Sequence, residues 1–281
     1  MKMPEKVIRF AEKYANWSEL RTLCLTFDID FVPDFMLERL LHMLAPFNVA
    51  ATFFATHDTP VLQRIRMNPQ YELAIHPFNN PASTQGNGLE EILGALRRIV
   101  PEAAGNRFHR LEHSYRDLLR LGELGYIYDA SAIRHNTPFL LPAWHNDMKM
   151  VLLTTLWEDG STEGMGYPMR LESVNLETPG MKILAFHPLN VYLNSKTPRD
   201  RSDFLRTVGN FQQCSEETAR HHYGNDGEGA RGVLRETLEL IRERQLGTVT
   251  ARQIAESFMQ AVGGKNEKAI GRETGKTEVS T

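Results

Sequence analysis

The chain of 281 residues is long enough for one large domain with a sizeable hydrophobic core, and barrels of this length commonly form a single domain. Its 32 basic and 35 acidic residues give a formal net charge of -3, so composition gives no reason to expect nucleic acid or an anionic membrane surface as a partner. The two cysteines, Cys24 and Cys214, are too few and too far apart to indicate a disulfide framework, which favours a reducing compartment.

The two ends of the sequence give expectations about location and domain boundaries. Residues 1–6 lead into a mixture of apolar and charged residues rather than the apolar segment of a signal peptide. No stretch approaches the ~20 apolar residues that a membrane-spanning helix needs, so we expect no membrane span and a cytoplasmic location. Residues 263–281 are polar and rich in Lys, Glu, Gly and Thr. We expect them to form a disordered tail after a domain of residues 1–262.

An apolar run with β propensity, residues 22–30 (TLCLTFDID), ends in two carboxylates, Asp28 and Asp30. Such a run predicts a strand buried on both faces, and parallel α/β folds place their chemistry at the carboxyl ends of strands. Residues two apart in a strand point to the same side, so both carboxylates could bind one metal, or one could bind it while the other moves a proton. The alternative is that Asp30 only caps the helix expected near residue 34.

The rest of the chain alternates between strand and helix patterns. Strands are predicted at residues 22–30, 49–56, 72–76, 106–109, 126–131, 148–156, 182–187 and 247–249. Helices are predicted at residues 35–44, 61–67, 89–100, 115–124, 204–213, 231–243 and 250–258. This alternation implies a parallel sheet, and about seven strands over this length favour a nearly closed barrel. We therefore predict an α/β fold with one domain, a distorted (β/α)7-type barrel.

Polar residues recur where the predicted strands end, and in a β/α barrel these ends lie on one face. They are Asp28, Asp30, His76, Arg107, His109 and His187. Any one of them could simply meet solvent, but four strands that end this way indicate a site. Aspartates and histidines without a suitable cysteine pair suit an ion such as Zn²⁺, which lowers the pKa of bound water to roughly 7. A carboxylate could take the proton and a histidine could protonate the leaving group, as in a hydrolase.

Five short segments occur in an order that resembles a known family. Residues 26–30 (TFDID), 51–54 (ATFF), 75–77 (IHP), 107–109 (RFH) and 184–188 (LAFHP) look like, in turn, its first aspartate motif, its second strand, the start of its histidine motif, its arginine motif and the late strand with its catalytic histidine. The family is the polysaccharide deacetylases with the NodB homology fold, grouped as carbohydrate esterase family 4. The resemblance runs from about residue 22 to about residue 258, and its specificity comes from the order of the motifs.

The resemblance implies a distorted (β/α) barrel that removes an N-acetyl or O-acetyl group from a sugar with a divalent metal, usually zinc. Carried over residue by residue, Asp28 is the general base, Asp30 and His76 are metal ligands, and His187 is the general acid. Arg107 holds the carboxylate of the base by a charge-assisted hydrogen bond.

One departure from the family pattern leaves the third metal ligand open. The family normally has two histidines four residues apart, whereas here His76 is followed at that spacing by Asn80, whose amide is a poor ligand for zinc. His109 is the first candidate, because its strand end should face the same mouth and the family usually has proline there. His113 is the second candidate if its segment is helical, although a surface helix residue is an equal alternative.

The remaining histidines and tryptophans are less informative. His42 lies in a helical pattern and is expected to be structural, while the adjacent His221 and His222 are assigned no role. Trp144 and Trp157 could line a sugar site, since an indole face stacks well on a pyranose ring, or could equally lie in the core.

The expected function is a cytoplasmic, metal-dependent deacetylase, with removal of an N-acetyl group favoured over an O-acetyl group. Metal-bound water attacks with Asp28 as base and His187 as acid, and the substrate is an acetylated sugar, nucleotide-sugar, lipid-linked sugar or glycan precursor of a surface polysaccharide. One alternative is a non-catalytic sugar-binding or scaffold protein with a decayed metal site, which Asn80 favours. The other is a metal-free hydrolase of a non-sugar amide. The sequence does not predict the oligomeric state.

Overall fold

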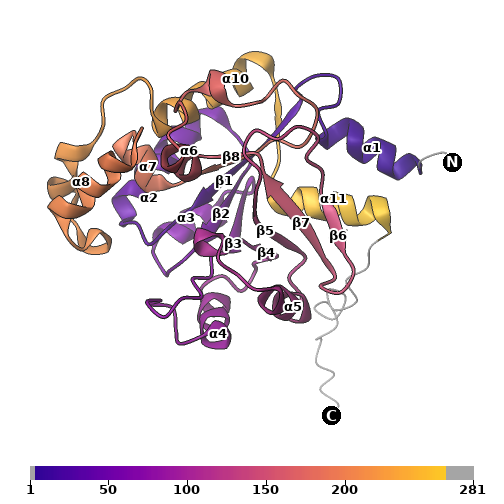
Figure 1. Cartoon of the computed structure of the whole chain (residues 1–281), viewed down its shortest axis with the longest axis horizontal. Helices are drawn as coiled ribbons and strands as arrows, with labels where there is room; N and C mark the ends of the chain where they lie inside the picture. Colours follow the sequence, from indigo (N-terminus) through magenta and orange to yellow (C-terminus); the bar gives the residue numbers. More distant parts are fainter. Residues whose placement is uncertain (1–3, 264–281) are drawn as a thin grey trace, which may run out of the picture.

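A computed structural model describes residues 4–263 as a parallel sheet with helices packed on both sides (Figure 1). The strands are β1 (Thr22–Asp28), β2 (Ala51–Ala55), β3 (Tyr71–Ile75), β4 (Gly105–Asn106), β5 (Tyr128–Ile133), β6 (Ala143–His145), β7 (Met150–Thr155), β8 (Trp157–Glu158), β9 (Ile183–Phe186) and β10 (Gly247–Thr248). The helices are α1 (Glu5–Tyr14), α2 (Asp34–Leu44), α3 (Val61–Met67), α4 (Leu89–Ile99), α5 (Tyr115–Glu123), α6 (Asp159–Gly164), α7 (Pro188–Leu193), α8 (Pro198–Val208), α9 (Glu216–Ala219), α10 (Ala230–Arg244) and α11 (Ala251–Val262).

The strand order places the chemically important strand ends on one edge. It runs β6-β7-β5-β4-β3-β2-β1-β9-β8, with β10 beside the start of β1. All neighbouring strands are parallel except β6 and β7, which are antiparallel. Because β1 lies between β2 and β9, Asp28 ends a central strand.

The sheet curves into a distorted barrel that is not closed by a continuous ladder. Strand β7 pairs with β5, and β8, which begins only two residues after β7 ends, pairs with β9 instead. Between them, the backbone N–H of Leu156 donates to the carbonyl of Ile183 at 2.9 Å. One stretch of chain therefore touches both ends of the strand order, and the predicted fold class is confirmed.

Alternation along β1 separates the outer core from the barrel interior. Its odd-numbered residues from Leu23 to Phe27 belong to a large apolar cluster that includes residues of α2, α3 and α10. Cys24 belongs to a second cluster with residues of α1 and α11, so Thr26 and Asp28, on the same side as Cys24, face the interior. Figure 1 shows these two helices on the opposite side of the sheet from α2 and α3. Both cysteines are free.

Several elements differ from the sequence prediction for local reasons. The helix predicted at residues 204–213 exists but is wrong in its bounds, because a capping box between Thr197 and Asp200 starts α8 at Pro198, and α8 ends before Gly209 at a φ of 67°. The antiparallel β6 and the helices α1, α6 and α7 were not predicted. In α1, Phe10 and Tyr14 are buried although the helix is polar on average.

The described residues bear on only some of the expectations about the tail and the membrane. The predicted tail at residues 263–281 lies outside the described residues, apart from Gly263, which follows α11. Among the described helices, none combines the length and apolar character needed to cross a membrane.

Candidate active site

The two aspartates of the first motif reach the site by different backbone conformations. Strand β1 ends at Asp28, while Asp30 and Phe31 adopt the left-handed region with φ of 49° and 59°. The prediction that both carboxylates project from one strand is therefore wrong in its geometry, although both line the same hollow. The helix-capping alternative for Asp30 is also wrong, because α2 follows Pro33 without a side-chain cap.

Arg107 crosses the barrel interior to hold Asp28. Its Nη1 donates to Asp28 Oδ1 at 2.8 Å and to Thr26 Oγ1 at 2.9 Å, and its Nη2 donates to Thr155 Oγ1 at 3.1 Å. The guanidinium also stacks on the Phe54 ring, 4.4 Å from its centroid. Both charged groups are almost fully buried, so the arginine fixes the carboxylate in position and compensates its charge.

A compact group of possible metal ligands lies beside this pair. Asp30, His76 and His109 each offer one ligand atom, and these atoms lie within 4.8 Å of one another. Asp30 Oδ1 is 3.1 Å from His76 Nε2 and 2.9 Å from His109 Nδ1. The other ring nitrogen of His76, Nδ1, is 2.6 Å from the carbonyl oxygen of Arg107, a partner that would leave Nε2 with its lone pair for a metal.

The structure also places the three candidates for the third ligand. His109 follows β4 and starts a short 3-10 turn, and its N–H donates to the Pro77 carbonyl at 2.9 Å, which holds it next to His76. His113 is exposed and packs on Phe108, outside the ligand group. Asn80 Oδ1 accepts from the backbone N–H of Ala82 at 3.1 Å, so its amide oxygen serves a turn.

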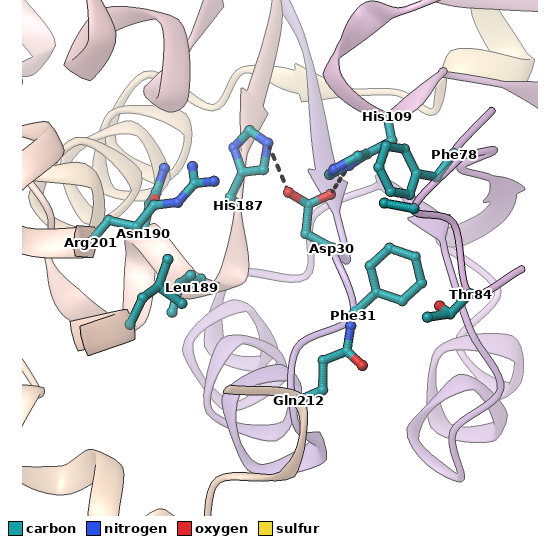
Figure 2. Close-up of a pocket in the computed structure, with 12 residues that line it drawn as sticks. Asp30, Phe31, Phe78, Thr84, His109, His187, Leu189, Asn190, Arg201 and Gln212 are labelled. Atoms are coloured by element: carbon teal, nitrogen blue, oxygen red, sulfur yellow. Dashed lines mark hydrogen bonds and ion pairs between the residues drawn. The ribbon is translucent and has the colours of Figure 1, made fainter. Parts of the chain in front are cut away.

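His187 faces the group from the opposite side (Figure 2). It follows β9, and its Nε2 lies 3.6 Å from Asp30 Oδ2 and 3.9 Å from Asp28 Oδ2. Asp30 thus stands between His187 and His109. The strand-end residues predicted from the sequence are therefore brought together around one hollow.

Two acidic residues that hold His187 were not assigned this role from the sequence. Asp159, fully buried at the start of α6, accepts from the His187 backbone N–H at 2.9 Å and contacts Nδ1 at 2.5 Å. Glu158 Oε1 lies 3.8 Å from His187 Nε2. In the sequence they directly follow Trp157, which was considered for a sugar site because of its indole ring and not for a contact with the histidine.

The electrostatics of the site follow from this arrangement. Burial alone would lower the pKa of His187, but Asp159, followed by Asp30 and Glu158, raises it well above the usual histidine value. Burial would raise the pKa of Asp30, but the nearby histidines hold it well below the usual aspartate value. The arrangement therefore favours an imidazolium at position 187 and a carboxylate at position 30.

The two tryptophans fall on different parts of the molecule. Trp157 is fully buried and packs on Phe186, with ring centroids 5.3 Å apart, so it is a core residue. Trp144 lies on β6, is partly buried against the apolar cluster that includes residues of α1 and α11, and donates to Asn146 Oδ1 at 3.0 Å. Neither tryptophan lines the hollow at the site.

Fold and site together define a carbohydrate deacetylase, in which polar residues at the carboxyl ends of the strands surround one hollow. A family model described as WbmS-like polysaccharide deacetylase matches residues 25–203, more than half of the chain. The chain therefore belongs to the WbmS-like polysaccharide deacetylase family, and the resemblance predicted from the sequence is confirmed. No protein with a curated description matches it.

The chain also resembles solved structures, and the first of those named here supports this assignment. A protein from Bordetella bronchiseptica, described as a polysaccharide deacetylase involved in O-antigen biosynthesis, is 30% identical with a TM-score of 0.71, over 83% of this chain and 94% of that chain. A polysaccharide deacetylase structure from Mycobacterium smegmatis is 19% identical over 84% and 96%, with a TM-score of 0.44. A family 4 carbohydrate esterase from Bacillus anthracis is 15% identical over 92% and 95%, with a TM-score of 0.45.

Proposed function

We propose that this deacetylase is metal-dependent and that Asp30, His76 and His109 hold the ion. The observation that carries the proposal is the convergence of their ligand atoms within 4.8 Å. Two imidazoles and a carboxylate are a donor set that suits Zn²⁺ and leaves a position open. When bound, the ion would polarise the acetyl carbonyl and lower the pKa of water, which supplies a nucleophile at neutral pH.

A second group, Asp28, Glu158 and His187, also brings ligand atoms within 4.8 Å but fits an ion less well. Asp28 Oδ1 already accepts from the guanidinium of Arg107, whose buried positive charge opposes a cation at the same carboxylate. We therefore assign proton transfer, not metal binding, to this second group.

Asp28 is positioned to act as the base and His187 as the acid. Arg107 binds Oδ1 of Asp28, while Oδ2 lies on the His187 side of the carboxylate and accepts no hydrogen bond from residues 4–263. There it can take a proton from attacking water. His187, kept protonated by its carboxylate neighbours, can give a proton to the leaving group from Nε2.

The place of His187, between the carboxylates of Asp159 and Asp30, supports an N-acetyl rather than an O-acetyl substrate. An amine leaves an amide only after its nitrogen is protonated, whereas an alkoxide leaves an ester with less help from an acid. The pKa of His187 is raised well above the usual histidine value, which keeps this proton available near neutral pH. Removal of an N-acetyl group therefore makes the fullest use of this residue.

For the substrate, we propose an acetylated sugar, free or linked to a nucleotide, a lipid or a growing glycan. The Bordetella bronchiseptica protein is described as involved in O-antigen biosynthesis, which supports a role in making a surface polysaccharide. A cytoplasmic location remains a prediction, to be tested by fractionation of cells that produce the protein.

Metal analysis is the first test. Protein purified without chelator should contain about one divalent ion per chain, and an Asp30→Ala, His76→Ala double variant should contain none. Acetate release from N-acetylated and O-acetylated sugars should follow the metal content. Activity in protein without metal, unaffected by added zinc, would favour the metal-free amide hydrolase. His109 Nδ1 lies 3.3 Å from His76 Nε2, which supports a complete ligand set over the non-catalytic alternative.

A further inference from the structure

The hollow over the site has a polar wall that the proposed chemistry does not use. A volume of about 170 Å³ opens beside Asp30 and His187. Figure 2 shows His109, Phe78 and Thr84 on one side of Asp30, with Asn190 and Arg201 next to each other beyond His187. Arg201 also lines the adjoining hollow of about 470 Å³ that contains Asp28, so it overlooks both spaces.

Asn190 is a buried amide whose hydrogen-bonding groups are unused. It sits on α7, three residues after His187, and only 1% of its surface is exposed. Within residues 4–263, neither Oδ1 nor Nδ2 has a hydrogen-bond partner. Buried side-chain amides are normally paired, so an unpaired one that lines a hollow points to a ligand that supplies both a donor and an acceptor.

Arg201 is a cation without a counterion over the same hollow. It lies on α8, where Arg199 and Arg206 both pair with Asp203, at 3.5 and 2.8 Å. In the part of the chain that the structure describes, Arg201 forms no ion pair or hydrogen bond. Burial raises the pKa of Glu163 to about 7, and the charge of Arg201 opposes this shift only in part; the two residues form no ion pair.

The acidic residues around the two hollows contact partners other than Arg201, and Asp30 lies 2.9 Å from His109 Nδ1. Asp28 is bound by Arg107, and Asp159 is bound by His187. Glu158 accepts from the backbone N–H of Ser161 at 3.1 Å. Arg110, a second arginine at the larger hollow, lies 3.4 Å from a carboxylate oxygen of Glu112. Arg201 is therefore placed to receive a negative charge from outside the protein.

We propose that Arg201 and Asn190 select acidic acetylated sugars as substrates. Arg201 binds an anionic substituent, either a carboxylate on the ring or a phosphate at the anomeric position, because its planar guanidinium matches both groups. Asn190 accepts from and donates to a neighbouring hydroxyl or amide group of the same sugar. The inference rests on the proposed function only in placing the acetyl group between Asp30 and His187.

Matched pairs of sugars separate the sources of the charge. The carboxylate arm compares 2-acetamido-2-deoxyglucuronic acid with its C6 amide. The phosphate arm compares N-acetylglucosamine 1-phosphate with the methyl glycoside of N-acetylglucosamine. The variants are Arg201→Gln and Asn190→Leu, with Arg199→Gln as the control, since Arg199 lies on the same helix and pairs with Asp203. Binding is measured by calorimetry and deacetylation by acetate release.

We expect at least one acidic sugar to bind the wild-type protein about tenfold or more tightly than its neutral partner. Arg201→Gln should remove this difference by raising KM about tenfold with little change in kcat, while Arg199→Gln keeps it. Asn190→Leu should weaken the acidic and neutral sugars alike. Because an apolar side chain at this buried position could disturb folding, Asn190→Asp is included, which should weaken the acidic sugars most.

Two results would overturn the inference: equal binding of acidic and neutral partners in both arms, or equal effects of Arg201→Gln and Arg199→Gln. If Arg201→Gln abolishes the preference for the acidic sugar in just one arm, the substituent tested in that arm is the one that Arg201 binds. Selective binding without acetate release from any sugar would count against the proposed function but leave this assignment standing, because calorimetry does not depend on turnover.

Discussion

The carboxylates of Glu72 and Asp28 both point into the barrel interior, but they differ in how many hydrogen bonds they accept and in whether they line a hollow. Glu72, at the amino end of β3, has both oxygens occupied: Oε1 accepts from Tyr128 at 2.7 Å, and Oε2 accepts from Thr52 at 2.8 Å and from the backbone N–H of Arg252 at 2.9 Å. At the carboxyl end of β1, Asp28 accepts from Arg107 with one oxygen, and its side chain also lines an open hollow.

The difference shows how one interior serves two purposes. The first turn of α11 covers Glu72, and its Ala251 N–H also bonds to Thr52 Oγ1 at 2.9 Å, so this end of the barrel is saturated with hydrogen bonds. At the other end Asp28 lines a hollow, and Arg107 bonds to only one of its oxygens. Saturation makes the first carboxylate structural, and incomplete pairing makes the second one usable for chemistry.

The largest effect that tests this comparison is expected from Asp28→Asn. Loss of the base should reduce kcat by about 10³-fold, because an amide cannot take a proton from water. Metal content should not change, since Asp28 is outside the proposed ligand set. The matched variant at the saturated end, Glu72→Gln, should keep kcat within about twofold. Full activity in Asp28→Asn would show that the base is assigned to the wrong residue.

The next effect concerns stability and comes from Arg107→Met. It removes the partner of a buried carboxylate, so the unfolding free energy should fall by about 3 to 5 kcal/mol. Urea denaturation measures this loss. Adding Asp28→Asn to the same chain should recover part of it, because the charge left without a partner is then gone. A double variant no more stable than Arg107→Met would mean that the cost comes from packing on Phe54 instead.

The parts of the site that could be predicted from sequence are those carried by regular strands. A continuous run of apolar residues, as in residues 22–28, indicates a buried strand. Because parallel strands bring their carboxyl ends together, Asp28, His76 and His187 could be placed in one site. The same logic gave the fold class. His109 was placed in this site as well, but its choice over His113 depends on a turn in which Arg110 and Leu111 both have positive φ.

The parts that could not be predicted depend on irregular backbone. Asp30 reaches the site through a left-handed turn that no periodicity signals, since aspartate adopts such a turn without requiring it. Asp159 contacts His187 only because β8 pairs with β9, a pairing made by two residues, Trp157 and Glu158. Asp159 and His187 are 28 residues apart in the sequence. A strand of two residues has no hydrophobic pattern from which their contact could be predicted.

Asp159→Asn should have a smaller effect than Asp28→Asn, because it acts through His187 and not on the substrate. With the charge that supports the imidazolium removed, kcat for an N-acetylated sugar should fall about 10- to 100-fold. 4-Nitrophenyl acetate, whose leaving group needs no protonation, should be hydrolysed almost normally. The control is Asp203→Asn, at a partly exposed aspartate on α8. If both substrates lost activity equally, Asp159 would be holding the fold of the site rather than the proton of His187.

The smallest expected effect is on stability, comes from Glu72 at the hydrogen-bonded end of the barrel, and depends on pH. Burial raises the pKa of Glu72 above its ordinary value of 4.5, and the hydrogen bonds from Arg252, Tyr128 and Thr52 only partly oppose it. Its carboxyl group therefore holds a proton more tightly in the folded than in the unfolded chain. As the pH rises above 4.5, the unfolded chain releases this proton first, so the contribution of Glu72 to stability falls.

Glu72→Gln removes this titration while its amide can keep the same contacts: Oε1 can accept from Thr52 and Arg252, and Nε2 can donate to the Tyr128 hydroxyl. The variant should match the wild type in stability at pH 4.5 and exceed it at pH 8, measured by urea denaturation. A variant that is less stable at both pH values would show that the saturated end needs the carboxylate itself, and the contrast with Asp28 would then lie in access to the hollow and not in hydrogen bonding.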